Sequence, residues 1–253
     1  MEDRLVQLEH HQQIAIIRLS RSIPNPINLD LVVELSQAIK GVQQDVSTRG
    51  LVLASANDKF FSIGFDIPEL FNLEEAEFAT FFQSFNRLCL DLYALPKPTA
   101  AAITGHATAG GCILALCCDY RYIAQGHKLV GLNEIQLGVP VPYPADCILR
   151  DLVRQHTAQE MLETGAFYEP EAASGLGFVD AVLPLQEVLP EALRKVREIG
   201  TFPMRAFAAI KRNRTEPVIK QIVERLDEKD QEFVACWYSV EARQRLKEAL
   251  SKF

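Results

Sequence analysis

The chain has 253 residues, 48% of them hydrophobic and 23% charged, a composition typical of one globular domain with room for an appended region. Its net charge of −7 disfavours nucleic-acid binding, which depends on basic side chains that neutralise phosphates. No apolar run reaches the roughly 18–20 residues that a membrane-spanning helix needs, and the first 13 residues lack the apolar centre of a signal peptide.

Short apolar segments rich in β-branched residues alternate with helical patterns through most of the chain. Residues 29–42 place apolar side chains on one helical stripe, and the apolar segment 109–118 predicts a buried helix. The predicted strands are residues 14–19, 51–55, 98–104, 120–124 and 179–183. This alternation predicts an α/β core.

The character of the sequence changes at about Leu193, where charged helical patterns replace the strands. Pro203 and Pro217 each precede a helical stretch, a position at which proline is tolerated, so we expect helices to begin there. Their apolar faces need a surface to pack on, for which a neighbouring subunit is one candidate. The sequence therefore predicts a core over residues 1–192 and a helical oligomerisation region over residues 193–253.

The cysteines and histidines of this sequence do not form a recognisable metal-binding or catalytic motif. The six cysteines form no CxxC pair, so we interpret them as reduced, buried side chains and expect no metal site. Among the five histidines, only His106 lies close to a glycine pair, Gly110 and Gly111.

Gly110 and Gly111 open the predicted buried helix, yet no lysine or hydroxyl residue follows them, which excludes a phosphate-binding loop. The first-turn amides of a helix have no partner within the helix, and together with a second glycine turn they can form an oxyanion hole. Alternatively, the glycines only allow the helix to pack closely on a strand. The spacing alone does not decide between the two.

Two further segments each place one acidic residue among apolar neighbours. Residues 60–66, FFSIGFD, follow a predicted strand, and Asp66 there is expected to cap the next helix. Residues 131–138, GLNEIQLG, carry one acid, Glu134, among apolar neighbours. From the pattern alone, Glu134 reads as a solvated or helix-capping acid, and Asp119 at the end of the buried helix reads as structural.

These motifs, with residues 97–124 and the later segment EPEAASGLGFVDAVLP, occur in the order typical of one family. The chain resembles the enoyl-CoA hydratase/isomerase (crotonase) superfamily from about Leu5 to its C-terminus. Within it, the sequence is most similar to the monofunctional Δ3,Δ2-enoyl-CoA isomerases. The resemblance implies a crotonase-like spiral of ββα units with a C-terminal all-helical trimerisation region, and a homotrimer or a dimer of trimers.

The resemblance also implies a site. A thioester carbonyl would be held by the backbone amides of Phe65 and Gly110, and Glu134 would be the catalytic residue. The acyl-CoA substrate would bring coenzyme A with it, so no separate cofactor and no metal is expected. The substrate and CoA contacts implied by matching positions are Pro26, Asn28, Ile63, Gly64, Ile113 and Asn133.

The position of Ile113 favours an isomerase over a hydratase. Hydratases of the superfamily hold a water between two glutamates, and one of these falls at Ile113, whose alkyl side chain cannot orient water. Isomerisation needs only one carboxylate to move a proton from C2 to C4, and a dry pocket suppresses hydration. A hydratase or another crotonase-family acyl-CoA enzyme, and a non-catalytic acyl-CoA-binding protein, stay open as alternatives.

The chain ends in Ser251-Lys252-Phe253, one residue different from the peroxisomal address Ser-Lys-Leu. We interpret this ending as coincidence. With neither an address nor a signal peptide in view, the sequence predicts a cytoplasmic protein with no membrane partner.

Overall fold

The computed structural model describes residues 4–250, and the C-terminal tripeptide lies outside them. Its main sheet has six strands in the order β1-β2-β4-β7-β9-β11, in which only β1 and β2 pair antiparallel. The strands are β1 (Val6–His11), β2 (Ile14–Leu19), β4 (Gly50–Ser55), β7 (Thr99–Ile103), β9 (Tyr120–Ala124) and β11 (Ala181–Leu183). The five predicted strands are confirmed, with ends displaced by up to two residues.

Two small parallel sheets bring the candidate motifs together. One has the order β10-β8-β5 and joins Val130–Gly131, His106–Thr108 and Phe60–Ser62. The other pairs β3 (Pro26–Ile27) with β6 (Gly64–Phe65). Segments separated by up to 70 residues in the sequence thus meet at the carboxyl ends of short strands.

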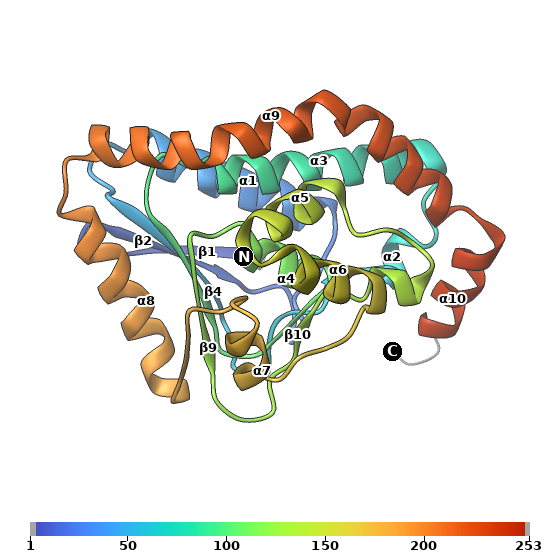
Figure 1. Cartoon of the computed structure of the whole chain (residues 1–253), viewed down its shortest axis with the longest axis horizontal. Helices are drawn as coiled ribbons and strands as arrows, with labels where there is room; N and C mark the ends of the chain where they lie inside the picture. Colours follow the sequence, from blue (N-terminus) through green and yellow to red (C-terminus); the bar gives the residue numbers. More distant parts are fainter. Residues whose placement is uncertain (1–3, 251–253) are drawn as a thin grey trace.

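Helices cover both faces of the main sheet (Figure 1). On one face, α8 (Leu185–Gly200) packs its buried side chains, such as Val188 and Val196, on the alternate strand residues that include Val52 and Ala100. The larger core on the other face contains α1 (Leu29–Gln44) and α3 (Glu75–Tyr93). The remaining helices before α8 are α2 (Ile67–Leu70), α4 (Gly110–Leu116), the 3-10 helix η1 (Glu134–Leu137), α5 (Tyr143–Leu152), α6 (Gln155–Thr164) and α7 (Pro170–Gly175).

The helical C-terminal region differs from the prediction in two details. Leu193 lies inside α8, so the helical region begins at Leu185. Pro217 does not start a helix but lies within α9 (Met204–Trp237), a single helix of 34 residues. An internal proline removes one backbone hydrogen bond. Contacts of α9 with α3 and α5 hold the helix against the core, which offsets the loss.

The apolar face of this region packs on the chain's own core. The Phe233 ring of α9 stacks on Phe82 of α3 at 3.9 Å between centroids, and Trp237 stacks on Phe78 at 4.4 Å. The last helix, α10 (Val240–Leu250), then turns back against η1, at the right of Figure 1. These contacts bring the C-terminal helices to the small sheets and their motifs.

Candidate active site

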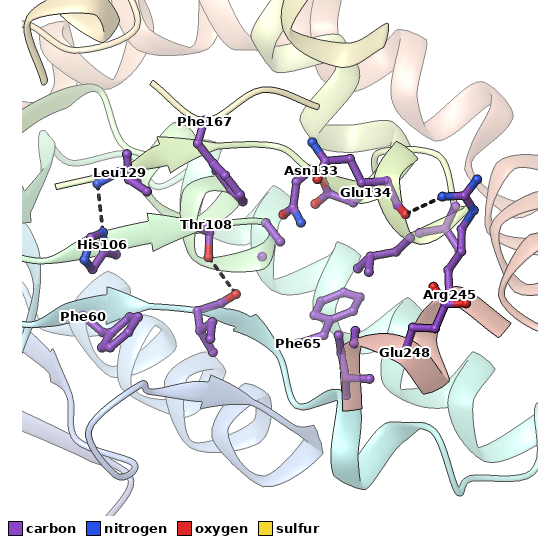
Figure 2. A pocket seen from close by; sticks show the side chains of 18 of the residues that line it. Phe60, Phe65, His106, Thr108, Leu129, Asn133, Glu134, Phe167, Arg245 and Glu248 are labelled. Carbon is purple, nitrogen blue, oxygen red and sulfur yellow. Dashed lines mark hydrogen bonds between the residues drawn. The ribbon is translucent and has the colours of Figure 1, made fainter. Parts of the chain in front are cut away.

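A pocket of about 1020 Å³ opens where the small sheets meet the C-terminal helices (Figure 2). Its floor is formed by residues of β5, β8 and the segments that follow them. Figure 2 shows His106 and Phe60 at one end, and Arg245 and Glu248 at the other. The residues that line it are Phe60, Ile63, Phe65, Ile67, His106, Thr108, Ala109, Gly110, His127, Leu129, Asn133, Glu134, Gln136, Leu137, Val139, Phe167, Phe233, Trp237, Arg245, Glu248 and Ala249.

The paired glycines divide two roles between them. Gly110 lines the pocket and is the first residue of α4, so its N–H has no partner within the helix. Gly111 faces away from the pocket, where a Cβ would stand 2.3 Å from the Ser62 carbonyl oxygen. The close-packing interpretation therefore holds for Gly111, while Gly110 presents an amide without a helical partner at the pocket wall.

Phe65 supplies the second candidate amide. The N–H of Asp66 donates to the Ile27 carbonyl across β3 and β6 at 2.9 Å. Successive amides of a strand point to opposite sides, so the Phe65 N–H is directed away from β3. Gly64, with φ of +98°, lets this segment approach α4 closely: a Cβ added to Gly64 would lie 3.0 Å from the Gly110 nitrogen.

The residue before Gly110 has an unusual backbone. Ala109 adopts φ 47° and ψ −123°, a conformation that favours glycine and is strained for an L-residue. Its N–H donates to the Gly131 carbonyl at 2.9 Å, which ties the start of α4 to the segment leading to Glu134. The strained residue thus connects α4, which carries the Gly110 amide, with the segment that leads to Glu134.

Glu134 lies at the first position of η1 and is only 5% exposed. Burial raises the pKa of its carboxyl group to about 8. Its Oε2 atom is buried with no hydrogen-bond partner in the part of the chain that the structure describes. A carboxyl group with this pKa can both accept and return a proton near neutral pH, which is the requirement for a general acid–base residue.

Two other predicted residues stand in the pocket wall, together with His106. Ile63 and Asn133 are half-buried beside the glycines and Glu134 respectively. His106 is also there, and its Nδ1 accepts the Leu129 N–H at 3.0 Å. This bond fixes the remaining imidazole proton on Nε2, and burial lowers the pKa of His106, so the ring is a neutral donor.

Four predicted contact residues are not among the lining residues. Ile113 is buried in the core one turn into α4, because its position in the helix points inward. Asn28 instead caps α1, accepting the Leu31 N–H at 3.0 Å, and donates to the Glu69 carboxylate. Pro26 and Gly64 pair in the β3–β6 sheet beneath the pocket. The structure thus shows Asn28 as a helix cap, and its expected contact with the substrate stays a prediction.

The two acids that were interpreted as structural are confirmed as such. Asp66 caps α2 by accepting the Glu69 N–H, and Arg21 pairs with it at 2.6 Å. Asp119 pairs with the buried Lys211 of α9 at 2.8 Å.

Several lining residues were not identified from the sequence. His127 lies in a loop, and its ring centroid is 5.7 Å from that of His106. Phe233, Trp237 and Arg245 come from the C-terminal helices, whose apolar pattern indicated burial but not its location. Arg245 donates to the Gln136 carbonyl of η1 at 3.3 Å, a contact between residues more than a hundred positions apart.

Within residues 4–250, no three His, Cys, Asp or Glu side chains are grouped so as to hold a metal ion. None of the helices in the same range is both long and apolar enough to cross a membrane.

The sequence and the fold were compared with those of known proteins. A family model described as enoyl-CoA hydratase/isomerase matches residues 9–253. Human mitochondrial enoyl-CoA delta isomerase 1 is 29% identical over 91% of this chain and 77% of its own length. Crotonyl-CoA hydratase of Syntrophomonas wolfei is 33% identical over 73% of this chain and 71% of its own length.

The crystal structure of human mitochondrial delta3-delta2-enoyl-CoA isomerase superposes with a TM-score of 0.95 at 28% identity, and the match covers 98% of each chain. The α/β core and the C-terminal helices are therefore shared along nearly the whole length.

Proposed function

Because this chain belongs to the enoyl-CoA hydratase/isomerase family, we propose that it is an enzyme that converts 3-enoyl-CoA to 2-trans-enoyl-CoA in fatty-acid β-oxidation, a Δ3,Δ2-enoyl-CoA isomerase. Both isomerases and a hydratase occur among its relatives. The proposal must therefore rest on the pocket itself, and one observation carries it: a single buried carboxyl group, Glu134, with a raised pKa.

Glu134 is the proton shuttle in this proposal. Its carboxylate removes a proton from C2 of the 3-enoyl thioester, and the electron pair of that C–H bond forms a dienolate with its negative charge on the thioester oxygen. The protonated Glu134 then returns the same proton to C4, and the double bond comes to rest between C2 and C3. The balance needs no water, oxidant or further acid.

The dienolate oxygen is stabilised by two backbone donors, the N–H groups of Phe65 and Gly110. Support for this comes from the close approach of Gly64 to Gly110 and from the position of Gly110 at the start of α4. Donors fixed before the charge develops need no reorganisation during the reaction, and loss of one such donor typically lowers kcat about 10²–10³-fold.

The hydration alternative needs a second carboxylate beside Glu134. Ile113 stands at the position where the related hydratases carry it, and it lies in the core. The other acid in the pocket wall, Glu248, is exposed on α10, and its side chain accepts a hydrogen bond from Gln244. In Figure 2 Glu248 lies beside Arg245, apart from Glu134.

The substrate contacts follow from the same pocket. Ile63 and Asn133 contact the acyl-CoA directly, while Pro26 and Gly64 support the Phe65 segment from below. Coenzyme A enters as part of the substrate, and no separate cofactor takes part.

The assembly and location belong to this proposal as well. We expect a homotrimer or a dimer of trimers, in which residues 193–253 contribute to the subunit contacts and residues 1–192 form the core. Sedimentation of the purified chain distinguishes these from a monomer. Cytoplasmic location stays a prediction, since the human, mouse and rat isomerases that match the chain are named as mitochondrial.

The deciding experiment gives purified protein 3-hexenoyl-CoA and, in parallel, 2-hexenoyl-CoA, and separates the products by chromatography. The isomerase predicts 2-trans-hexenoyl-CoA from the first and little hydration of the second. Glu134→Gln should abolish this conversion while ligand affinity is retained. Dominant formation of 3-hydroxyacyl-CoA would establish a hydratase instead, and binding without turnover would establish an acyl-CoA-binding protein.

A further inference from the structure

We propose that Thr108 is a positioning residue for the oxyanion hole: its hydroxyl bridge to Ile63 sets the spacing of the two segments that carry the Phe65 and Gly110 amides. This inference rests on the proposed function, because it takes those two amides as the donors. It assigns a role to a side chain that the sequence motifs did not single out.

The bridge occupies equivalent places on both segments. Thr108 Oγ1 donates to the Ile63 carbonyl oxygen at 2.9 Å, and Figure 2 draws this bond across the pocket floor. Ile63 lies two residues before Phe65, and Thr108 lies two residues before Gly110. One hydrogen bond therefore joins the two segments two residues before each donor amide.

The backbone does not provide this connection. The pairing of β5 with β8 shifts register between Phe60 and Ser62, and its last pair joins Ser62 to Ala107. The Thr108 hydroxyl bonds Ile63 one residue beyond that pair, so a side chain continues the link where the ladder stops.

The residues between the bridge and the donors make the position of each amide depend on its surroundings. Gly64 has φ of +98° and no side chain to hold it, and Ala109 has the strained φ of 47°. Neither residue fixes the following amide by itself, because glycine is permissive and a strained residue relaxes when its surroundings allow. Stabilisation of an oxyanion requires both donors within hydrogen-bond distance of one point, so a small separation of the segments is costly.

Thr108 acts through Ile63 rather than on the substrate. Its single hydroxyl proton is used in the bond to the Ile63 carbonyl, so the oxygen keeps only acceptor capacity toward the pocket. A thioester carbonyl offers no proton to that oxygen. The hydroxyl therefore neither donates to the dienolate nor moves a proton.

The test compares Thr108→Val, which keeps the shape and removes the O–H, with Thr108→Ser, which keeps the O–H. Loosening the bridge should lower kcat about tenfold in the valine variant, less than the 10²–10³-fold typical of losing a donor, with KM changed less than about twofold. The serine variant should retain most of the wild-type kcat.

A second readout does not depend on turnover. Acetoacetyl-CoA can bind as its enolate, whose ultraviolet absorbance reports charge stabilisation in the oxyanion hole. We expect the bound enolate-to-keto ratio to fall about tenfold in Thr108→Val and to stay near wild type in Thr108→Ser.

The outcomes separate this inference from the proposed function. Wild-type kcat and enolate ratio in Thr108→Val overturn the positioning role, as does a lower Tm with both quantities unchanged. Equal losses in the valine and serine variants also overturn it. A wild-type protein that fails to isomerise 3-enoyl-CoA contradicts the proposed function, while the enolate ratio still tests the bridge. If the wild type binds acetoacetyl-CoA without enolate, the oxyanion assignment and the bridge both fall.

Discussion

Gly111 and Ser62 are in direct contact: an added Cβ on Gly111 would stand 2.3 Å from the Ser62 carbonyl oxygen and 2.7 Å from the Ser62 Cβ. The contact joins α4 to β5, the strand that leads to Phe65. Gly111 therefore holds the first turn of α4 against the second candidate donor segment, and it does so through packing alone.

Gly111→Ala should consequently destabilise the protein by about 1–3 kcal/mol, since the nearest obstructing atom is a backbone carbonyl oxygen that cannot move aside easily. The matched control is Gly41→Ala in α1, where nothing lies within 4 Å of the new Cβ. There the substitution should stabilise by about 0.5–1 kcal/mol through helix propensity. Urea unfolding of both variants measures the difference, and equal stabilities would contradict the packing role.

The pKa of Glu134 predicts the pH dependence of activity. A general base must be ionised to remove a proton, so kcat/KM should rise with pH and level off above about 8. The measurement is kcat/KM for 3-hexenoyl-CoA from about pH 5 to about pH 10. A profile that is flat from pH 5 upward would show that the pKa of Glu134 is not raised. The raised pKa would then no longer support Glu134 as the catalytic base.

The same group should destabilise the fold when it ionises. Its pKa is raised from 4.5 to about 8 in the folded protein, so between these values the folded state binds the proton more tightly than the unfolded state. Stability is therefore lost as the pH rises through this range. Glu134→Gln should be more stable than wild type by about 2 kcal/mol or more at pH 9, and nearly equal to it at pH 4. Unfolding at both pH values checks this, and a gain that does not change with pH would indicate another cause.

Local patterns predicted much of the fold because strand and helix periodicity are local properties. The strands around Leu51 and Tyr120 follow from short β-branched or aromatic runs, and the α1 stripe from its helical spacing. Pro217 shows the limit, because only the contacts of α9 with its neighbours decide that the helix continues through it.

The helix start at Gly110 was predictable from the local sequence, whereas the burial of Glu134 was not. Glu134 is the first residue of η1, and Gly138, which caps the end of η1, packs so closely on α10 that an added Cβ would lie 3.0 Å from the Cα of Ala242. No local pattern around Glu134 reveals that a helix a hundred residues later packs against η1. The same long-range packing explains why Trp237 and Arg245 were missed.

The strained conformation of Ala109 leads to the last prediction. Glycine adopts φ of 47° without the steric cost that alanine has, so Ala109→Gly should relieve strain and stabilise the fold by about 1 kcal/mol. Glycine also gives the Gly110 amide more freedom, because the Ala109 Cβ now fills the space beside Gly64. We therefore expect kcat to fall several-fold with little change in KM, while Tm rises. Thermal unfolding and steady-state kinetics on the same preparation test the pairing of these effects. A variant that is both more stable and fully active would show that the strain at Ala109 has no part in holding the Gly110 donor.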